Sequence, residues 1–193
     1  MRRIRVFAHV SLDGVISTGD EDSADGDWTA PYRSPAGAAA LVETQGTSFD
    51  LLLGRRTYDL WSNYWPKVKG GPFADSLNVA AKYVATHRPE SLEWGPIGNL
   101  GADVLDGIRG LKTSDGPDLL VWGSTVLTAA LFERGLVDEV TLVVYPVLIG
   151  RGKRFFSDRV TPRELAFVGT QTSPTGAQIN TYRHIGALQA PPK

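Results

Sequence analysis

The stretch FDLLLGRRTY, at residues 49–58, decides the fold of this chain. Residues 49–53 form an apolar run that is too short for a helix and ends at Gly54, a pattern typical of a strand buried on both faces. Residues 56–63, which follow directly, have a helical period. A buried strand that leads straight into a helix is half of a parallel β-α-β unit. The stretch therefore predicts a parallel sheet covered by helices.

The same strand-then-helix order recurs along the chain. Further strands are predicted at 4–10, 82–85 and 118–123, and further helices at 36–45, 103–112 and 125–134. The C-terminal third differs, because a long strand at 139–147 is followed by two alternating segments, 164–172 and 178–185, on either side of a turn at 173–176. The predicted class is α/β, with a mostly parallel central sheet and a C-terminal antiparallel hairpin.

The composition is that of one ordinary globular domain. The chain has 193 residues, of which 42% are hydrophobic and 21% are charged, and its formal net charge is −1. We expect a single domain over residues 1–186 and a disordered tail over 187–193. A charge so close to neutral does not favour nucleic acid or a membrane surface as a partner, and no apolar run approaches the length of a membrane span.

Cysteine is absent from the sequence, which excludes disulfides, thiolate metal sites and cysteine nucleophiles and fits a cytoplasmic protein. The apolar stretch after the basic N-terminus is interrupted at His9 and again at Asp13, so it is too short for a signal-peptide core. The three histidines are scattered and have no nearby carboxylates in a ligand spacing. No metal site is therefore predicted.

Residues suited to binding an anion follow three of the predicted strands. The ligand of an open parallel sheet lies beyond the carboxyl ends of its strands, where helix N-termini present free N–H groups. Three such strand ends predict a dinucleotide with several phosphates, and arginines at two of them favour NADP over NAD. The groups are Gly54, Arg55, Arg56 and Thr57; Thr86, His87 and Arg88; and Gly123, Ser124 and Thr125.

Simpler interpretations of these residues remain open. Arg55 and Arg56 are also compatible with solvated arginines at the start of a helix, and Gly123 with Ser124 is compatible with an ordinary helix cap. The G-x-G-x-x-G fingerprint is absent, which disfavours a standard Rossmann domain. The prediction therefore depends on the three groups occurring together.

Several motifs resemble one known family. LGRRTY at 53–58 is similar to the cofactor-binding motif of dihydrofolate reductases. SLDGVI at 11–16, GSTVL at 123–127, GLVDEV at 135–140 and PVLIGRGKRFF at 146–156 resemble the reductase domain of bacterial bifunctional riboflavin-biosynthesis deaminase-reductases. The matches occur in the same order and span residues 4–185, without the deaminase domain. The resemblance implies a stand-alone member with the dihydrofolate-reductase-like three-layer sandwich, NADPH as cofactor and a homodimeric state.

The resemblance also implies roles for individual residues. Val126 joins the ten residues of the three strand-end groups as a cofactor-binding position. Asp13 is the first candidate for the proton donor, followed by Asp27 and Glu43, because the acidic residue that dihydrofolate reductases carry on their first helix is missing here. The expected substrate-binding residues are Ser11, Gly14, Trp28, Pro146, Leu148, Gly150 and Gly152. Three further aromatic residues could stack on a planar substrate or pack in the core: Tyr32, Trp61 and Trp65.

These observations favour an NADPH-dependent reductase of a small planar heterocycle. The expected substrate is pterin-like or resembles an aminouracil riboflavin precursor with a phosphoribosylamino group. One alternative is a non-catalytic nucleotide-binding module with the same fold. Another is a homodimeric scaffold with a vestigial pocket, which is disfavoured because Arg55, Arg56, Thr86 and Arg88 are all retained.

Overall fold

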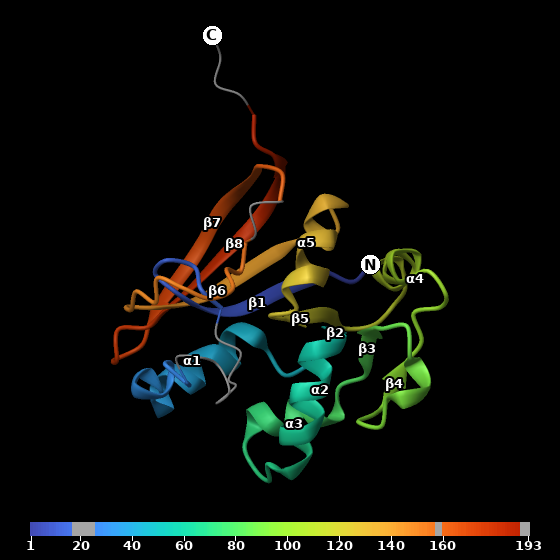
Figure 1. The fold of residues 1–193 in the computed structure, drawn as a ribbon, viewed down its shortest axis with the longest axis horizontal. Helices are drawn as coiled ribbons and strands as arrows, with labels where there is room; N and C mark the ends of the chain where they lie inside the picture. Colours follow the sequence, from blue (N-terminus) through green and yellow to red (C-terminus); the bar gives the residue numbers. More distant parts are fainter. Residues whose placement is uncertain (17–25, 157–159, 190–193) are drawn as a thin grey trace.

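The computed structural model describes residues 1–16, 26–156 and 160–189. Within them, eight strands form one sheet in the order β4-β3-β2-β5-β1-β6-β8-β7 (Figure 1). Strands β1 to β6 run parallel to one another, whereas β8 is antiparallel to β6 and β7 is antiparallel to β8. The strands are β1 Ile4–Ser11, β2 Phe49–Gly54, β3 Lys82–Ala85, β4 Ile97–Gly98, β5 Asp118–Trp122, β6 Glu139–Tyr145, β7 Arg163–Thr172 and β8 Gln178–Ala187. The predicted class is confirmed.

Helices cover both faces of the sheet and make a three-layer sandwich. They are α1 Pro35–Gln45, α2 Arg55–Tyr64, α3 Pro72–Val79, α4 Val104–Thr113 and α5 Thr125–Glu133. Successive side chains of a strand point to opposite faces, so neighbouring residues of β1 enter different cores. Val6 packs with Ile108 of α4 and Leu131 of α5, whereas Phe7 packs in the core that contains Leu77 of α3. Helices α4 and α5 therefore lie on one face, and α1, α2 and α3 on the other (Figure 1).

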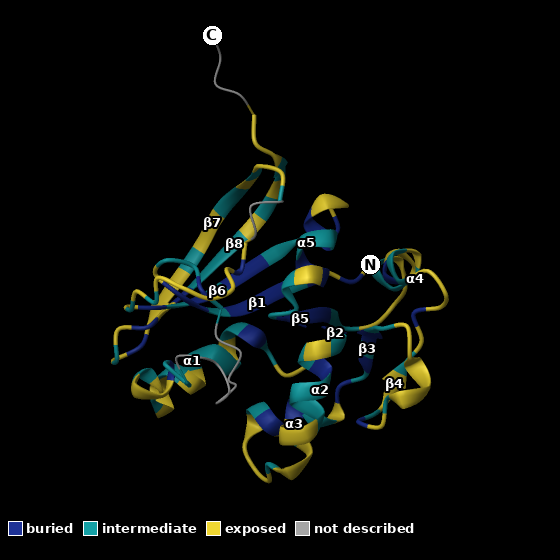
Figure 2. Cartoon of the chain, in the orientation of Figure 1, coloured by how far each residue is buried: buried dark blue, intermediate teal, exposed yellow. Residues whose placement is uncertain are grey.

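The centre of the sheet holds most of the buried surface. Leu51, Leu52 and Leu53 of β2 have 0% relative exposure, as predicted from their apolar run. Figure 2 shows the buried residues concentrated in the central strands, whereas edge strand β7 is largely exposed. Buried strands in the middle of the sheet hold their carboxyl ends in fixed positions. The residues that follow those ends can thus form a preorganised site.

Two features differ from the sequence-based expectations. Residues 72–79 form α3, which the sequence analysis did not assign, because eight residues carry little periodicity. Strand β8 extends to Ala187, and the amide of Leu188 donates to the carbonyl of Pro162 at 3.1 Å, so the chain is still attached to the sheet where the tail was expected to begin. Residues 190–193 of that tail lie outside the described part. No helix in the described ranges is long and apolar enough to cross a membrane.

Candidate functional site

Helices α2 and α5 begin next to each other at the carboxyl edge of the sheet, on opposite faces. Gly54 ends β2, and its amide donates to the hydroxyl of Ser124 at 2.9 Å. That hydroxyl in turn donates to Thr57 Oγ1 at 3.1 Å. Gly123 and Ser124 have φ values of +54° and +45°, which turn the chain sharply from β5 into α5. One serine hydroxyl therefore ties the starts of both helices together.

This junction has the features of an anion-binding site. The first amides of α2 and α5 have no partners within their helices, and both helix dipoles present their positive ends here. A Cβ at Gly54 would lie 3.4 Å from Ser124 Cβ and Oγ, so glycine keeps the approach to the junction open. Thr125 is partly buried and Val126 is 77% exposed at the start of α5. The structure thus brings together two of the three sets of residues that were predicted to bind phosphate, the sets at 54–57 and 123–125.

Arg55 joins this junction to the loop after β3. Its Nη1 donates to Ser91 Oγ at 2.6 Å and to the carbonyl of Arg88 at 3.3 Å. It also lies 3.5 Å from Thr86 Oγ1, which accepts from the Arg88 amide at 3.1 Å. Residues Arg56, His87 and Arg88 are exposed at the same edge. The three predicted groups therefore share one edge of the sheet, and Arg55 holds the loop at 86–91 against α2.

An aromatic wall lies beside this edge on the α1–α3 face of the sheet. The ring of His9 stacks on Trp122, with ring centroids 5.2 Å apart and an interplanar angle of 27°. The ring centroids of Tyr145 and His9 are 5.7 Å apart. The rings of Trp28 and Tyr32 pack edge-on against Tyr145, with centroid separations of 5.6 and 5.7 Å. These five residues are called the aromatic wall below. Trp122 and Tyr145 are buried, at 4% and 6% relative exposure, whereas His9, Trp28 and Tyr32 are partly exposed. A planar heterocycle could therefore reach only the latter three side chains.

Two further aromatic residues from the sequence analysis lie next to the wall. Trp61 packs against Trp122 with ring centroids 6.0 Å apart. Trp65 packs on Trp61 and on Phe73 of α3 and makes no ring contact with the wall, so it belongs to the core below α2.

His9 and Tyr145 form a neutral hydrogen-bonded pair within the wall. The Tyr145 hydroxyl lies 2.9 Å from His9 Nδ1. Burial lowers the pKa of His9 to about 4, with Arg33 lowering it further and Asp27 partly opposing the change. Burial also raises the pKa of Tyr145 to about 12. The direction of this hydrogen bond depends on the tautomer of the imidazole: when the Tyr145 hydroxyl donates to Nδ1, the imidazole proton lies on Nε2.

The sequence analysis missed His9 and Tyr145. The available signal was the alternation along β1, which puts His9 on the same face as Ser11, two residues closer to the middle of the strand. Tyr145 is paired with Ser11 across the β1–β6 ladder, directly before the motif at 146–156.

Asp13, the first candidate for the proton donor, binds a loop. Its carboxylate accepts from the Ser11 hydroxyl at 2.6 Å and from the amides of Ile149 and Gly150 at 3.1 and 2.8 Å. These hydrogen bonds, with that of Ser11 the largest contribution, lower the pKa of Asp13 to about 2. Asp13 is therefore ionised at neutral pH, and it ties the end of β1 to the loop at 149–150; this linkage is called the clasp below. Its role as a proton donor stays a prediction.

The predicted substrate-side segments do meet at this clasp. The amide of Leu12 donates to the carbonyl of Val147 at 2.9 Å, and the amide of Phe155 donates to the carbonyl of Gly14 at 2.9 Å. A Cβ at Gly152 would lie 3.0 Å from Val15, which shows how closely the two segments approach. The expected substrate residues Ser11, Gly14, Pro146, Leu148, Gly150 and Gly152 therefore belong to one pair of loops beyond β1 and β6.

The other two proposed acids, Asp27 and Glu43, have different surroundings. Burial favours the neutral form of Asp27, but hydrogen bonds from Thr29 and the charge of Arg33 outweigh burial and lower its pKa. Glu43 lies beside Arg5, in a depression at the amino ends of β1 and β6. Six residues of β1, or about 20 Å, separate that edge from Ser11. Glu43 is thus corrected to a residue outside the site.

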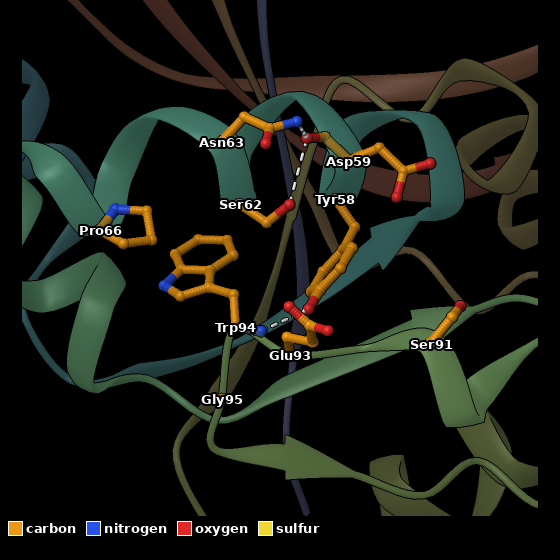
Figure 3. A pocket seen from close by; sticks show the side chains of 9 residues that line it. All are labelled: Tyr58, Asp59, Ser62, Asn63, Pro66, Ser91, Glu93, Trp94 and Gly95. Atoms are coloured by element: carbon orange, nitrogen blue, oxygen red, sulfur yellow. Dashed lines mark hydrogen bonds between the residues drawn. The ribbon is translucent and has the colours of Figure 1, made fainter.

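A groove of about 380 Å³ lies along α2 (Figure 3), and Asp59, which lines it, is paired with Arg55. Asp59, Ser62 and Asn63 line it from α2, and the segment at 91–95 forms the opposite wall. The groove is lined by Tyr58, Asp59, Ser62, Asn63, Pro66, Ser91, Glu93, Trp94 and Gly95.

In the described ranges no group of three or more histidine, aspartate or glutamate side chains could hold a metal ion.

Comparisons with known proteins agree with this architecture. A family model described as the RibD C-terminal domain matches residues 2–179. The uncharacterized protein YyaP of Bacillus subtilis strain 168 is 28% identical over 189 residues, which cover 96% of each chain. A protein assigned to riboflavin biosynthesis in Shewanella sp. PV-4 has a similar structure, with 21% identity, a TM-score of 0.69 and coverage of 95% of this chain and 99% of that one. Dihydrofolate reductase from Enterococcus faecalis, complexed with NADP(H), is 16% identical with a TM-score of 0.60, and the match covers 94% and 96% of the two chains.

Proposed function

The chain belongs to the RibD C-terminal domain family, and from this premise we propose that it is an NADPH-dependent reductase of a planar heterocycle. The substrate class that we propose is an aminouracil riboflavin precursor or a pterin-like ring. The observation that carries the proposal is the junction of α2 and α5 at Ser124, which lies beside the aromatic wall at the same edge of the sheet. This arrangement would place an anion site beside aromatic side chains that could contact a planar ring.

The proposed cofactor site uses backbone and side-chain donors. The starts of α2 and α5 would hold the diphosphate, while Arg55, Thr86, His87 and Arg88 would surround the 2′-phosphate. Bound NADPH would supply the hydride. The clasp made by Asp13 would keep the loops at 11–16 and 146–154 closed over the ring that is reduced, because it fixes Ile149 and Gly150 to the end of β1.

The aromatic wall would orient the substrate. A ring stacked there could accept a hydrogen bond from His9 Nε2 when the hydroxyl of Tyr145 donates to Nδ1. A neutral imidazole that donates in this way polarises a carbonyl or an imine without becoming charged. The wall therefore favours a neutral, planar ring that carries a hydrogen-bond acceptor.

Titration with NADPH and NADH, followed by tryptophan fluorescence, tests the cofactor assignment. We expect the wild type to bind NADPH more tightly than NADH, and Arg55→Ala to weaken NADPH binding about ten-fold because it loses a charged phosphate ligand. Arg109→Ala is a matched control, because Arg109 is an exposed arginine paired with Asp106 on α4. Failure of both nucleotides to bind the wild type would refute the reductase assignment.

A non-catalytic nucleotide-binding module is the second candidate function. The observation that favours it is the state of the acids, since Asp13 and Asp27 are ionised and Glu43 is remote. Oxidation of NADPH in the presence of aminouracil and pterin substrates distinguishes the two functions. Turnover with any of them supports the reductase, and tight NADPH binding without turnover supports the binding module.

We also propose that the chain forms a homodimer. Phe167 and Val168 on edge strand β7 are 62% and 57% exposed, which supports an interface that includes this strand. Light scattering coupled to size-exclusion chromatography measures the mass directly. A monomeric mass at all concentrations contradicts this proposal and leaves the cofactor site unaffected.

A further inference from the structure

The charge of Arg55 is already compensated within the chain. Its Nε donates to both carboxylate oxygens of Asp59, at 2.8 and 3.0 Å, one turn further along α2. The side chains of Arg55 and Asp59 are 25% and 47% exposed. The arginine motif after β2 thus carries a carboxylate at the point where a cofactor phosphate would bind.

We propose that Asp59 is a determinant of cofactor specificity, whose charge reduces the preference for NADPH over NADH. This inference rests on the proposed function, because it assumes that Arg55 faces the 2′-phosphate. The two nucleotides differ only in that phosphate, so a negative charge beside Arg55 acts on one and spares the other. The chain is then more tolerant of NADH than its arginines suggest.

The hydrogen bonds of Arg55 show how this competition arises. Nε is occupied by Asp59, and Nη1 by Ser91 and the carbonyl of Arg88. Nη2 has no hydrogen bond to any part of the chain that the structure describes, so it is the guanidinium nitrogen that remains available to a phosphate. Nε and Nη2 are bonded to the same carbon atom of the guanidinium. A phosphate on Nη2 would therefore lie well within one Debye length, about 10 Å, of the Asp59 carboxylate.

Solvent moderates the repulsion without removing it. Asp59 lines the groove along α2, opposite Ser91 and Glu93, so water and salt reach its carboxylate (Figure 3). A terminal phosphate carries a charge of roughly −1.5 to −2 at neutral pH, so the effect is larger than for a single charge. From screened charges at this separation we expect a change in NADPH affinity of about five-fold.

The substitution Asp59→Asn removes the charge and keeps an oxygen that can accept from Arg55 Nε. We expect it to tighten NADPH binding about five-fold at low salt while NADH binding changes by less than about two-fold. The gain should shrink when the ionic strength rises, because screening weakens the repulsion in the wild type. Fluorescence titrations of NADPH, NADH, 2′-phospho-AMP and AMP provide the four dissociation constants, and none of them requires turnover.

Two variants separate charge from other effects. Asp59→Glu keeps the charge and should show no gain for NADPH. Asp106→Asn removes an exposed carboxylate paired with Arg109 on α4 and should leave all four dissociation constants unchanged. Circular dichroism spectra that match the wild type establish that each variant is folded.

The outcomes distinguish this inference from the proposed function. If the wild type binds NADPH and Asp59→Asn leaves the NADPH-to-NADH ratio unchanged, the role of Asp59 is overturned and the reductase assignment stands. A weaker affinity for NADPH in Asp59→Asn also overturns it, because Asp59 would then orient Arg55 for binding. If neither nucleotide binds the wild type, both proposals fail.

Discussion

Replacing His9 with glutamine should remove most of the loss of stability on acidification between about pH 7 and pH 5. The pKa of His9 is about 4 in the folded protein, against 6.5 for an unperturbed histidine. Between these values the unfolded chain holds a proton on His9 that the folded chain lacks. The free energy of unfolding therefore decreases as the pH falls through this window. Below about pH 4 the contribution of His9 to this free energy no longer changes with pH.

The magnitude follows from the two pKa values. The difference between 6.5 and about 4 corresponds to about 3 kcal/mol over the whole window, at about 1.4 kcal/mol for each pKa unit. Between pH 7 and pH 5, the proton-binding equilibria give a decrease of about 2 kcal/mol for the wild type. Asp13 and Asp27, whose pKa values are lowered, affect stability mainly below the unperturbed aspartate value of 3.8, so this range reports on histidine.

Denaturant unfolding at several pH values, followed by tryptophan fluorescence, measures this slope. His9→Gln loses the stacking on Trp122, so the comparison uses the change with pH rather than the stability at one pH. Equal slopes for the wild type and His9→Gln would show that His9 is protonated as easily in the folded state as in the unfolded state.

Two further predictions concern glycine packing and the clasp. Gly107→Ala should destabilise the protein by about 1–3 kcal/mol, although alanine favours helices, because its Cβ would overlap the carbonyl oxygen of Leu100. Gly110 lies in the same helix with open space around it, so Gly110→Ala should instead stabilise the protein by up to about 1 kcal/mol. Thermal unfolding of both variants, compared with the wild type, measures the two effects. Asp13→Asn should speed amide hydrogen exchange at Gly150, because the acceptor of that amide loses its charge. Unchanged exchange measured by mass spectrometry would contradict the clasp.

The local signals in the sequence were enough to predict the sheet and to bring the three proposed phosphate-binding groups to one edge of it. The run at 51–53 predicts a strand buried on both faces, and Gly54 marks its end, because each signal depends on neighbouring residues only. The three anion-binding groups could be placed together because parallel strands have their carboxyl ends at one edge. The contact of Gly54 with Ser124, 70 residues later, then follows from the adjacency of β2 and β5.

The chemical state of individual side chains could not be predicted in this way. The pKa of Asp13 is lowered by the Ser11 hydroxyl and by amides 136 and 137 residues further along the chain, and an aspartate before a glycine gives no sign of those amides. Glu43 was considered because it is the carboxylate on the helix at 36–45, but the direction of that helix places it at the amino edge of the sheet. His9 was passed over because its environment is formed by Trp122 and Tyr145 from distant strands.

The charge states around the aromatic wall limit how the proposed reduction can proceed. Asp13 and Asp27 remain ionised at neutral pH, which disfavours either as a general acid. His9 is a neutral donor through Nε2 when Tyr145 donates to its Nδ1, and a donor of this kind stabilises negative charge that develops on an acceptor atom without releasing its proton. The proton that the proposed reduction requires would then come from water. On this reading the substrate is activated by a positioned neutral donor, and the acidic residue that is absent from α1 is not required.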